Sequence, residues 1–224
     1  HKALLLIKGK PIIEYQIDAF YQAGITKIYI VTGYNSHLFD SYKDQVTILY
    51  NPNWQNSNML ISIMTAKDLL NESSSIISYS DIFYESFALK SLLNQTELSI
   101  LYSTSWKELW KKRFKNATDD AETFSIDDFA YLKNIGEPLD CLSNACGQYM
   151  GIISFTPKIF YQFNKIFCTL TEEKRNKIDV TSFLKHLLIS KSLNIKTIAY
   201  KGVWGEVDIP ADLDLYNSSS FYFP

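Results

Sequence analysis

The sequence predicts one α/β domain with a mainly parallel, mixed sheet flanked by helices. Short runs of β-branched and apolar residues, at 27–33, 46–50 and 75–81, are typical of strands buried on both faces. Helix-like segments separate these runs, and the order helix, strand, helix, strand at such lengths indicates βαβ units. The 224 residues suffice for one large domain, 1–224, with a core of its own.

Helices are predicted where apolar residues recur at intervals of three and four. From Ile12 to Tyr21 they do so, and Gly24 closes that helix as a residue suited to a left-handed C-terminus. Late in the chain, Phe183, Leu184 and Leu187 form a second such stripe. This second stripe belongs to an expected helix at 180–192. By the same reasoning we expect further helices at 36–42, 59–70, 84–94 and 157–167.

Strands are predicted from the remaining short apolar runs, at 98–102 and 195–200. A second sheet section is expected from 121–126, 129–132 and 146–154. Gly147 and Gly151 flank Gln148 in the last of these. Paired glycines in a strand indicate close approach of another backbone or a ligand.

The segment 104–155 departs from the α/β rhythm, and we interpret it as an inserted acceptor-binding or lid section. Trp106 and Trp110 are four residues apart, basic residues follow at 111–113, and acidic residues follow at 119–122. Large aromatic side chains beside charges of both signs suit a substrate-binding arm. A solvated amphipathic helix with its tryptophans against the core is an equally good interpretation of the two tryptophans.

Composition excludes several classes of protein. The formal net charge of −2 and the absence of a Lys/Arg block argue against a nucleic-acid partner. The three cysteines form no CxxC pair and indicate reduced thiols rather than a disulfide framework or zinc site. The three histidines are far apart in the sequence, which supports neither a histidine metal site nor a catalytic triad. No apolar run approaches the ~18–20 residues of a membrane span, so we expect a soluble, cytoplasmic protein without membrane insertion.

Two isolated aspartates are candidates for a metal site. Asp81 ends the run 75–81, where a buried strand passes into a loop, and ligands of open α/β sheets bind at that edge. Asp208 follows a Trp-Gly-Glu turn and precedes a helix that begins at Pro210. Mg²⁺ prefers one or two carboxylates together with phosphate oxygens. A turn at Asp81 and a helix cap at Asp208 are the structural alternatives.

Other polar residues have structural interpretations that spacing alone favours. Asn58 and Ser62 are one turn apart at a helix start and could face a phosphate or a base, but capping explains Asn58 equally well. For Asp179, which precedes the helix at 180–192, capping is the stronger interpretation.

Several motifs, taken in their order along the chain, resemble those of the sugar-nucleotide-type nucleotidyltransferases. Within that family they resemble the phosphocholine cytidylyltransferase-like branch. The segments that carry the resemblance are 1–5, 8–17, 28–34, Asn51-Pro52, Ser57-Asn58, Ser80-Asp81, 147–151 and 204–213. Each is weak alone, and their ordered combination across the chain is specific for the superfamily.

The resemblance implies a Rossmann-like nucleotidyltransferase fold and Mg²⁺-dependent transfer of a nucleotidyl group to a phosphate or phosphonate oxygen, with release of pyrophosphate. It assigns Asp81 and Asp208 to the metal and Lys2 to the phosphates. It assigns Asn58 and Ser62 to the nucleotide, and we add Gly33 from the matching segment 28–34. The family's strand and Gly-rich loop should precede His1, so we expect the chain to lack its extreme N-terminus.

For the acceptor we assign Trp106, Arg113, Asp120, Glu122 and Gln148. Aromatic faces and negative charge attract ammonium groups, so we expect CTP as the donor and a small zwitterion such as phosphocholine or 2-aminoethylphosphonate as the acceptor. A sugar 1-phosphate or polyol phosphate is the alternative, with Lys112 and Arg113 serving an anionic acceptor. A glycosyltransferase and a non-catalytic nucleotide-binding domain are alternatives from other classes. The sequence leaves open the base of the nucleotide, the identity of the acceptor and whether the protein forms a homodimer.

Overall fold

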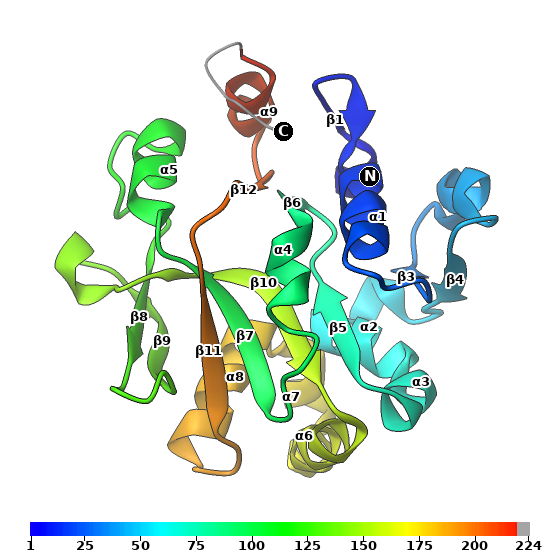
Figure 1. Ribbon diagram of the computed structural model, residues 1–224. Coiled ribbons are helices and arrows are strands. Elements are labelled where there is room, and N and C mark those ends of the chain that lie inside the picture. Colours follow the sequence, from blue (N-terminus) through cyan, green and yellow to red (C-terminus); the bar gives the residue numbers. More distant parts are fainter. Residues whose placement is uncertain (219–224) are drawn as a thin grey trace.

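The computed structural model describes residues 1–218 and has a four-stranded sheet at its centre (Figure 1). The strand order is β11–β7–β10–β5, from Ile195–Tyr200, Leu98–Ser103, Gln148–Phe155 and Ser75–Ser78. β7 runs parallel to β11, whereas β10 is antiparallel to both β7 and β5. Three of the four strands therefore share one direction, and the predicted α/β fold with a mainly parallel, mixed sheet is confirmed.

Four two-stranded pairs surround this sheet. The parallel pair is β3 and β4, Tyr29–Thr32 and Thr47–Tyr50. The antiparallel pairs are β6 and β12 (Ile82–Tyr84 and Trp204–Glu206), β8 and β9 (Glu122–Ile126 and Leu132–Pro138), and β1 and β2 (Leu6–Ile7 and Lys10–Pro11).

The α-helices of residues 1–218 are α1 Ile12–Gln22, α2 Met59–Thr65, α3 Lys67–Glu72, α4 Ser86–Lys90, α5 Trp106–Arg113, α6 Pro157–Thr169, α7 Glu172–Lys177, α8 Val180–Ile189 and α9 Pro210–Asn217. Short 3₁₀ helices occur at Lys2–Leu4, Ser36–Tyr42, Trp54–Asn56 and Leu142–Asn144. None of the helices in this range is long and apolar enough to cross a membrane.

Apolar side chains from the sheet and from α6 and α8 form the main core. Phe163 of α6 lies edge-on to both Phe155 of β10 and Phe183 of α8, with ring centroids 4.9 and 4.8 Å apart. All six residues of β7 are buried because the strand has neighbours on both edges and side chains on both faces. This core fixes the ends of β5, β7 and β11, from which the candidate site is built.

Several predicted boundaries differ from the structure. The expected helix 59–70 is two helices, because the backbone at Ala66 (φ −95°, ψ 14°) leaves helical geometry. The expected strand at 129–132 begins only at Leu132, since Asp127 accepts from the backbone of Phe129 and Tyr131 and forms a turn there. β10 was expected in a second sheet section but lies in the main sheet, so the inserted section ends before residue 148.

The two glycines of the β10 region lie against aromatic rings, whereas their spacing predicted close approach of another backbone or a ligand. A Cβ on Gly147 would lie 2.2 Å from Cδ2 of Tyr102. Gly151 has φ +75°, and a Cβ there would lie 2.8 Å from Cγ of Tyr79. The close approach is confirmed, and its partners are protein side chains.

Candidate active site

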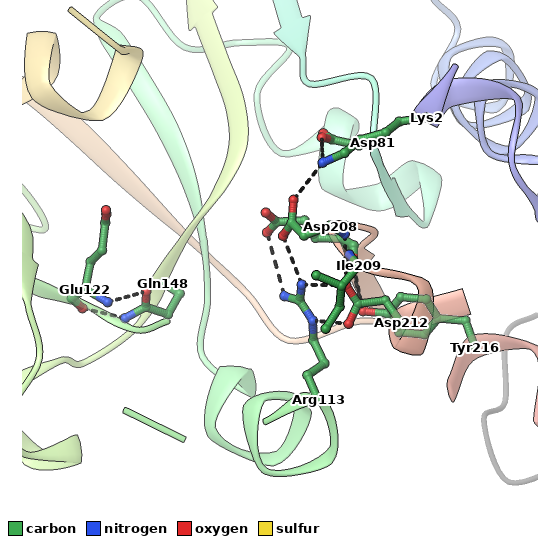
Figure 2. A network of polar contacts seen from close by, with 10 residues as sticks. Lys2, Asp81, Arg113, Glu122, Gln148, Asp208, Ile209, Asp212 and Tyr216 are labelled. Atoms are coloured by element: carbon green, nitrogen blue, oxygen red, sulfur yellow. Dashed lines mark hydrogen bonds and ion pairs between the residues drawn. The ribbon is translucent and has the colours of Figure 1, made fainter. Parts of the chain in front are cut away.

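Three side chains that are distant in sequence meet beyond the ends of β5 and β11 (Figure 2). Nζ of Lys2 lies 3.3 Å from Oδ2 of Asp81 and 2.9 Å from Oδ1 of Asp208. Asp81 follows β5, and Asp208 follows β12, which continues the chain from β11. The two carboxylates therefore converge on one point, as we expected from their strand-end positions.

Backbone hydrogen bonds explain this convergence. β6 and β12 pair antiparallel, with Ile82 opposite Glu206, and Val207 donates its N–H to the Asp81 carbonyl over 2.9 Å. Gln16, a buried residue of α1, donates its side-chain amide to the carbonyls of Tyr79 and Ile82, on either side of Asp81. The loop that carries Asp81 is thus held from two directions. Gln16 lay within the family-like segment 8–17 but was not assigned a role from the sequence.

The charges of Lys2 and Asp208 stabilise each other. Burial favours the protonated form of Asp208, but hydrogen bonds from Glu206, Lys2 and Arg113 outweigh it and lower its pKa to about 2. Burial likewise opposes the charge of Lys2, but Asp208 and Asp81 raise the Lys2 pKa above its ordinary value. Lys2 is therefore a cation and Asp208 an anion at neutral pH.

Glu206 adds a second carboxyl group beside Asp208. Burial, followed by its hydrogen bond and repulsion with Asp208, raises the pKa of Glu206 to about 9. A protonated Glu206 can donate to Asp208, which favours the charged form of Asp208. Glu206 lay within the family-like segment 204–213 but was not assigned a role from the sequence.

Arg113 lies beneath Asp208 and is fully buried. Its Nε and Nη2 donate to the two oxygens of Asp212, over 2.9 and 3.0 Å, and Nη2 also donates to Oδ2 of Asp208 over 3.0 Å. The expected role of Arg113 as a contact for the acceptor is wrong in this structure, because its side chain is 0% exposed and its Nε and Nη2 are bound to protein carboxylates.

Three further carboxylates lie near the site, and we call Asp120, Glu122 and Asp179 the acidic cluster. Burial first, and then the charges of Asp179 and Asp120, raise the pKa of Glu122. The pKa of Asp120 is raised by burial and by Asp208 and Asp212, against an opposing effect of Arg113. Asp120 is thus the member of the cluster whose charge interacts with Asp208, and Glu122 is linked to it through Asp120. Tyr79 adjoins the cluster, since burial and then Asp179 and Asp81 raise the pKa of its phenol.

Asp179 is also a helix cap, as predicted, because its Oδ1 accepts from the Ser182 N–H over 2.7 Å.

Gln148 differs from its expected role as a contact for the acceptor. Its amide exchanges two hydrogen bonds with the backbone N–H and carbonyl of Glu122, at 3.1 and 2.6 Å (Figure 2). Gln148 therefore positions Glu122 and has no amide group directed at a ligand.

The position of Trp106 differs most from the acceptor-binding role that we expected for it. Its side chain is only 1% exposed and packs edge-on to Trp110, with ring centroids 6.0 Å apart. Trp110 is 3% exposed and stacks on Trp204. The structure thus has the alternative arrangement, a helix with its tryptophans against the core. The expected contact between Trp106 and an acceptor is wrong here because the ring has no exposed face.

The residues assigned to the nucleotide also make internal contacts. Asn58 caps α2 by accepting from the Ile61 N–H, and it donates to the carbonyls of Arg175 and Ile178 over 2.7 and 2.8 Å. Ser62 donates to the Asn58 carbonyl and accepts from Asn51. The structure brings Asn58 and Ser62 together, and their role toward a nucleotide stays a prediction.

Gly33, the third residue assigned to the nucleotide, is covered by Trp54, whose Cβ would lie 2.3 Å from a Cβ at this position. The indole of Trp54 in turn lies 5.2 Å from the exposed ring of Tyr34, centroid to centroid. Gly33 thus allows the loop after β3 to pack against the 3₁₀ helix at Trp54–Asn56, and its contact with a nucleotide also stays a prediction.

The site fits a magnesium ion by the chemistry of its donors. Two carboxylates already converge on one cation, the Lys2 ammonium, and Mg²⁺ prefers one or two carboxylates plus substrate phosphates to an all-protein cage. Consistent with this, residues 1–218 contain no group of three or more His, Cys, Asp or Glu side chains arranged to hold a metal. Asp81 and Asp208 are the residues that would hold the ion.

Ligands of open α/β sheets bind outside the carboxyl ends of the parallel strands, and Lys2, Asp81 and Asp208 meet beyond the ends of β5 and β11. The chain belongs to the family of MobA-like NTP transferase domains, whose model matches residues 1–150. It is therefore a nucleotidyltransferase, as its motifs had indicated.

Individual relatives agree with this family. The chain is 31% identical over 229 residues to the CTP:phosphoglutamine cytidylyltransferase of Campylobacter jejuni, covering 96% of this chain and 90% of that protein. The inositol-1-phosphate CTP transferase of T. maritima superposes with a TM-score of 0.70 at 15% identity, covering 99% and 89%. The CTP:phosphocholine cytidylyltransferase of Streptococcus pneumoniae does so with a TM-score of 0.71 at 16% identity, covering 96% and 88%. These structures support the Rossmann-like nucleotidyltransferase fold.

Proposed function

We propose that the protein transfers CMP from CTP to a small acceptor that carries a phosphate or phosphonate group and an ammonium group, with release of pyrophosphate. The observation that carries the chemistry is the convergence of Asp81, Asp208 and Lys2 on one point. CTP is favoured because the three relatives compared above are named for CTP-dependent reactions.

In this reaction an acceptor oxygen forms a bond to the α-phosphorus of CTP as the bond from that phosphorus to the leaving oxygen breaks. Both reactants are anions, so the site must position them and offset their charge. Lys2 supplies a fixed positive charge at the point where the carboxylates meet. Mg²⁺ bound at Asp81 and Asp208 would supply further charge neutralisation to the phosphates. The acceptor is already ionised, so no side chain has to remove a proton.

The acidic cluster supports an acceptor with an ammonium group. The charges of Asp120 and Asp179 raise the pKa of Glu122, Asp208 raises that of Asp120, and Asp179 raises that of Tyr79. A cationic substituent bound here would lower this repulsion. With Trp106 buried, recognition of the ammonium group relies on these carboxylates. Phosphocholine, 2-aminoethylphosphonate and phosphoglutamine all carry such a group, whereas a sugar 1-phosphate does not.

The test is an assay of pyrophosphate release by the purified protein. Each nucleoside triphosphate would be combined with the three amine-bearing acceptors, glucose 1-phosphate and inositol 1-phosphate, with Mg²⁺ or with EDTA. We expect turnover with CTP and an amine-bearing acceptor, and none with EDTA. Asp208→Ala should abolish it, while Asp214→Asn, which changes an exposed carboxylate of α9, should not.

Faster turnover of the sugar or polyol phosphate would overturn the acceptor proposal and leave the nucleotidyltransferase class intact. Full activity in EDTA, or in Asp208→Ala, would overturn the proposed metal site. Equal activity of Glu122→Gln and the parent protein toward all acceptors would remove the role of the acidic cluster.

A further inference from the structure

A buried ion pair lies directly behind Asp208. The side chains of Arg113 and Asp212 are both 0% exposed, and Arg113 donates to both oxygens of Asp212 through Nε and Nη2. Arg113 comes from the last turn of α5 and Asp212 from the first turn of α9. Such a bidentate pair fixes both direction and distance, because the planar guanidinium matches the carboxylate plane.

This pair holds Asp208 by its side chain and by its backbone. Nη2 of Arg113 donates to Oδ2 of Asp208 over 3.0 Å. Oδ2 of Asp212 accepts from the N–H groups of Asp208 and Ile209, over 2.9 and 3.1 Å. One oxygen of Asp208 is thus bound from behind, while the other, Oδ1, faces Lys2 and the Asp81 side of the site (Figure 2).

The surroundings of Arg113 favour a guanidinium over an ammonium. Its Cζ lies 5.1 Å from the ring centroid of Trp110 and 4.9 Å from that of Phe114, within range of cation–π contact. A lysine would keep the charge but could not reach both Asp212 oxygens and Asp208 in one plane.

We propose that Arg113, through its ion pair with Asp212, is a positioning residue that orients the carboxylate of Asp208 toward a divalent metal ion. The inference rests on the proposed function only in its use of that metal. It applies to any nucleotide donor and any acceptor, and it gives the inserted section a role in the metal site.

The test compares four proteins: the parent, Arg113→Lys, Asp212→Asn and the control Arg175→Lys. Arg175 is the other arginine of the sequence, and its side chain donates to the Cys168 carbonyl, away from Asp208. Mn²⁺ affinity would be measured from the electron paramagnetic resonance signal of the free ion, with and without CTP. Loss of a residue that orients a metal ligand typically weakens affinity about 10–100-fold, which we expect for Arg113→Lys and Asp212→Asn but not for Arg175→Lys.

A kinetic measurement separates positioning from general loss of structure. If Arg113 acts through the metal site, kcat of Arg113→Lys at low Mg²⁺ should fall by a similar factor and recover as Mg²⁺ is raised. A defect that Mg²⁺ does not relieve, or an Mn²⁺ affinity equal to that of Arg175→Lys, would overturn the inference. If the parent binds no Mn²⁺ under either condition, the metal site itself and this inference both fail.

The parent protein offers a check that needs no variant. The N–H groups of Asp208 and Ile209 are bonded to Asp212, so their hydrogen exchange, measured by NMR, should be slowed well below that of a free peptide. Exchange of both amides at the free rate would show that Asp212 does not hold this backbone, and would overturn the inference even if the variants failed to fold.

Discussion

Replacing Gly151 by alanine tests how tightly β10 packs against Tyr79. Gly151 has φ +75°, where a residue with a Cβ costs about 1–2 kcal/mol. Its Cβ would also lie 2.8 Å from Cγ of Tyr79, and such overpacking typically costs about 1–3 kcal/mol. Alanine also lowers the conformational entropy of the unfolded chain, and this effect offsets about 0.4–1 kcal/mol of the two costs. We therefore expect Gly151→Ala to lower the free energy of unfolding by about 1–5 kcal/mol.

The chain provides controls that separate the two costs. Gly9 has φ +82° with nothing within 4 Å of an added Cβ, so Gly9→Ala carries the backbone cost alone, about 1 kcal/mol. Gly147 does not have a positive φ, and its Cβ would lie 2.2 Å from Tyr102, so Gly147→Ala carries the clash alone. Urea unfolding followed by circular dichroism, with linear extrapolation to water, measures all three variants.

The result also bears on the proposed function, because the charges of Asp179 and Asp81 both act on the Tyr79 phenol. A ring displaced by the new methyl group should raise KM for the acceptor more than KM for CTP. A Gly151→Ala variant that loses no more stability than Gly9→Ala would refute the reasoning, since Tyr79 would then be free to move aside without cost.

Three other predictions concern stability. Phe183→Ala empties a fully buried position between α6 and α8 and should cost about 3–5 kcal/mol in urea unfolding, whereas a loss below 1 kcal/mol would mean that the core collapses to fill the space. Asn58→Asp keeps the cap of α2 but removes both bonds donated to α7. Limited proteolysis should therefore cut near α7 sooner than in the parent, and an unchanged pattern would contradict this tie. Burial and the Glu14 carboxylate raise the pKa of Tyr42 to about 12, so its contribution to stability is complete below pH 10 and is lost as pH rises from there toward 12. Tyr42→Phe should reduce the fall in urea midpoint between pH 9 and 11, and an equal fall in both proteins would argue against it.

The fold could be predicted because its strands are short apolar runs that only a covered sheet can bury. β7 is the clearest case, with all six residues buried between two neighbouring strands. Strand direction could not be predicted, since β10 has the same composition whether it runs parallel or antiparallel to β7. The break at Ala66 was equally hidden, because alanine is a good helix former and the turn there depends on packing.

The convergence of the two carboxylates could be predicted from position and family motifs, but the residues that hold them in place could not. Asp81 and Asp208 each follow a strand, and the ends of parallel strands meet at one edge. Arg113 was taken for a contact of the acceptor because Lys111 and Lys112 precede it in a basic run. The sequence nevertheless contains a signal that Arg113 is buried. Residues 106, 110 and 113 have the spacing i, i+4 and i+7 of one helix face, so Arg113 shares the buried face of the two tryptophans.

The burial of that face changes how the inserted section can work. Trp110 stacks on Trp204 with ring centroids 5.6 Å apart, and Arg113 pairs with Asp212, so α5 is fastened to the segment that carries Asp208. A lid that swings from α5 would have to break a buried ion pair, which typically costs about 3–5 kcal/mol. The base of the section is therefore fastened rigidly behind Asp208, and any movement of the section has to occur beyond Arg113, where Asp120 and Glu122 lie.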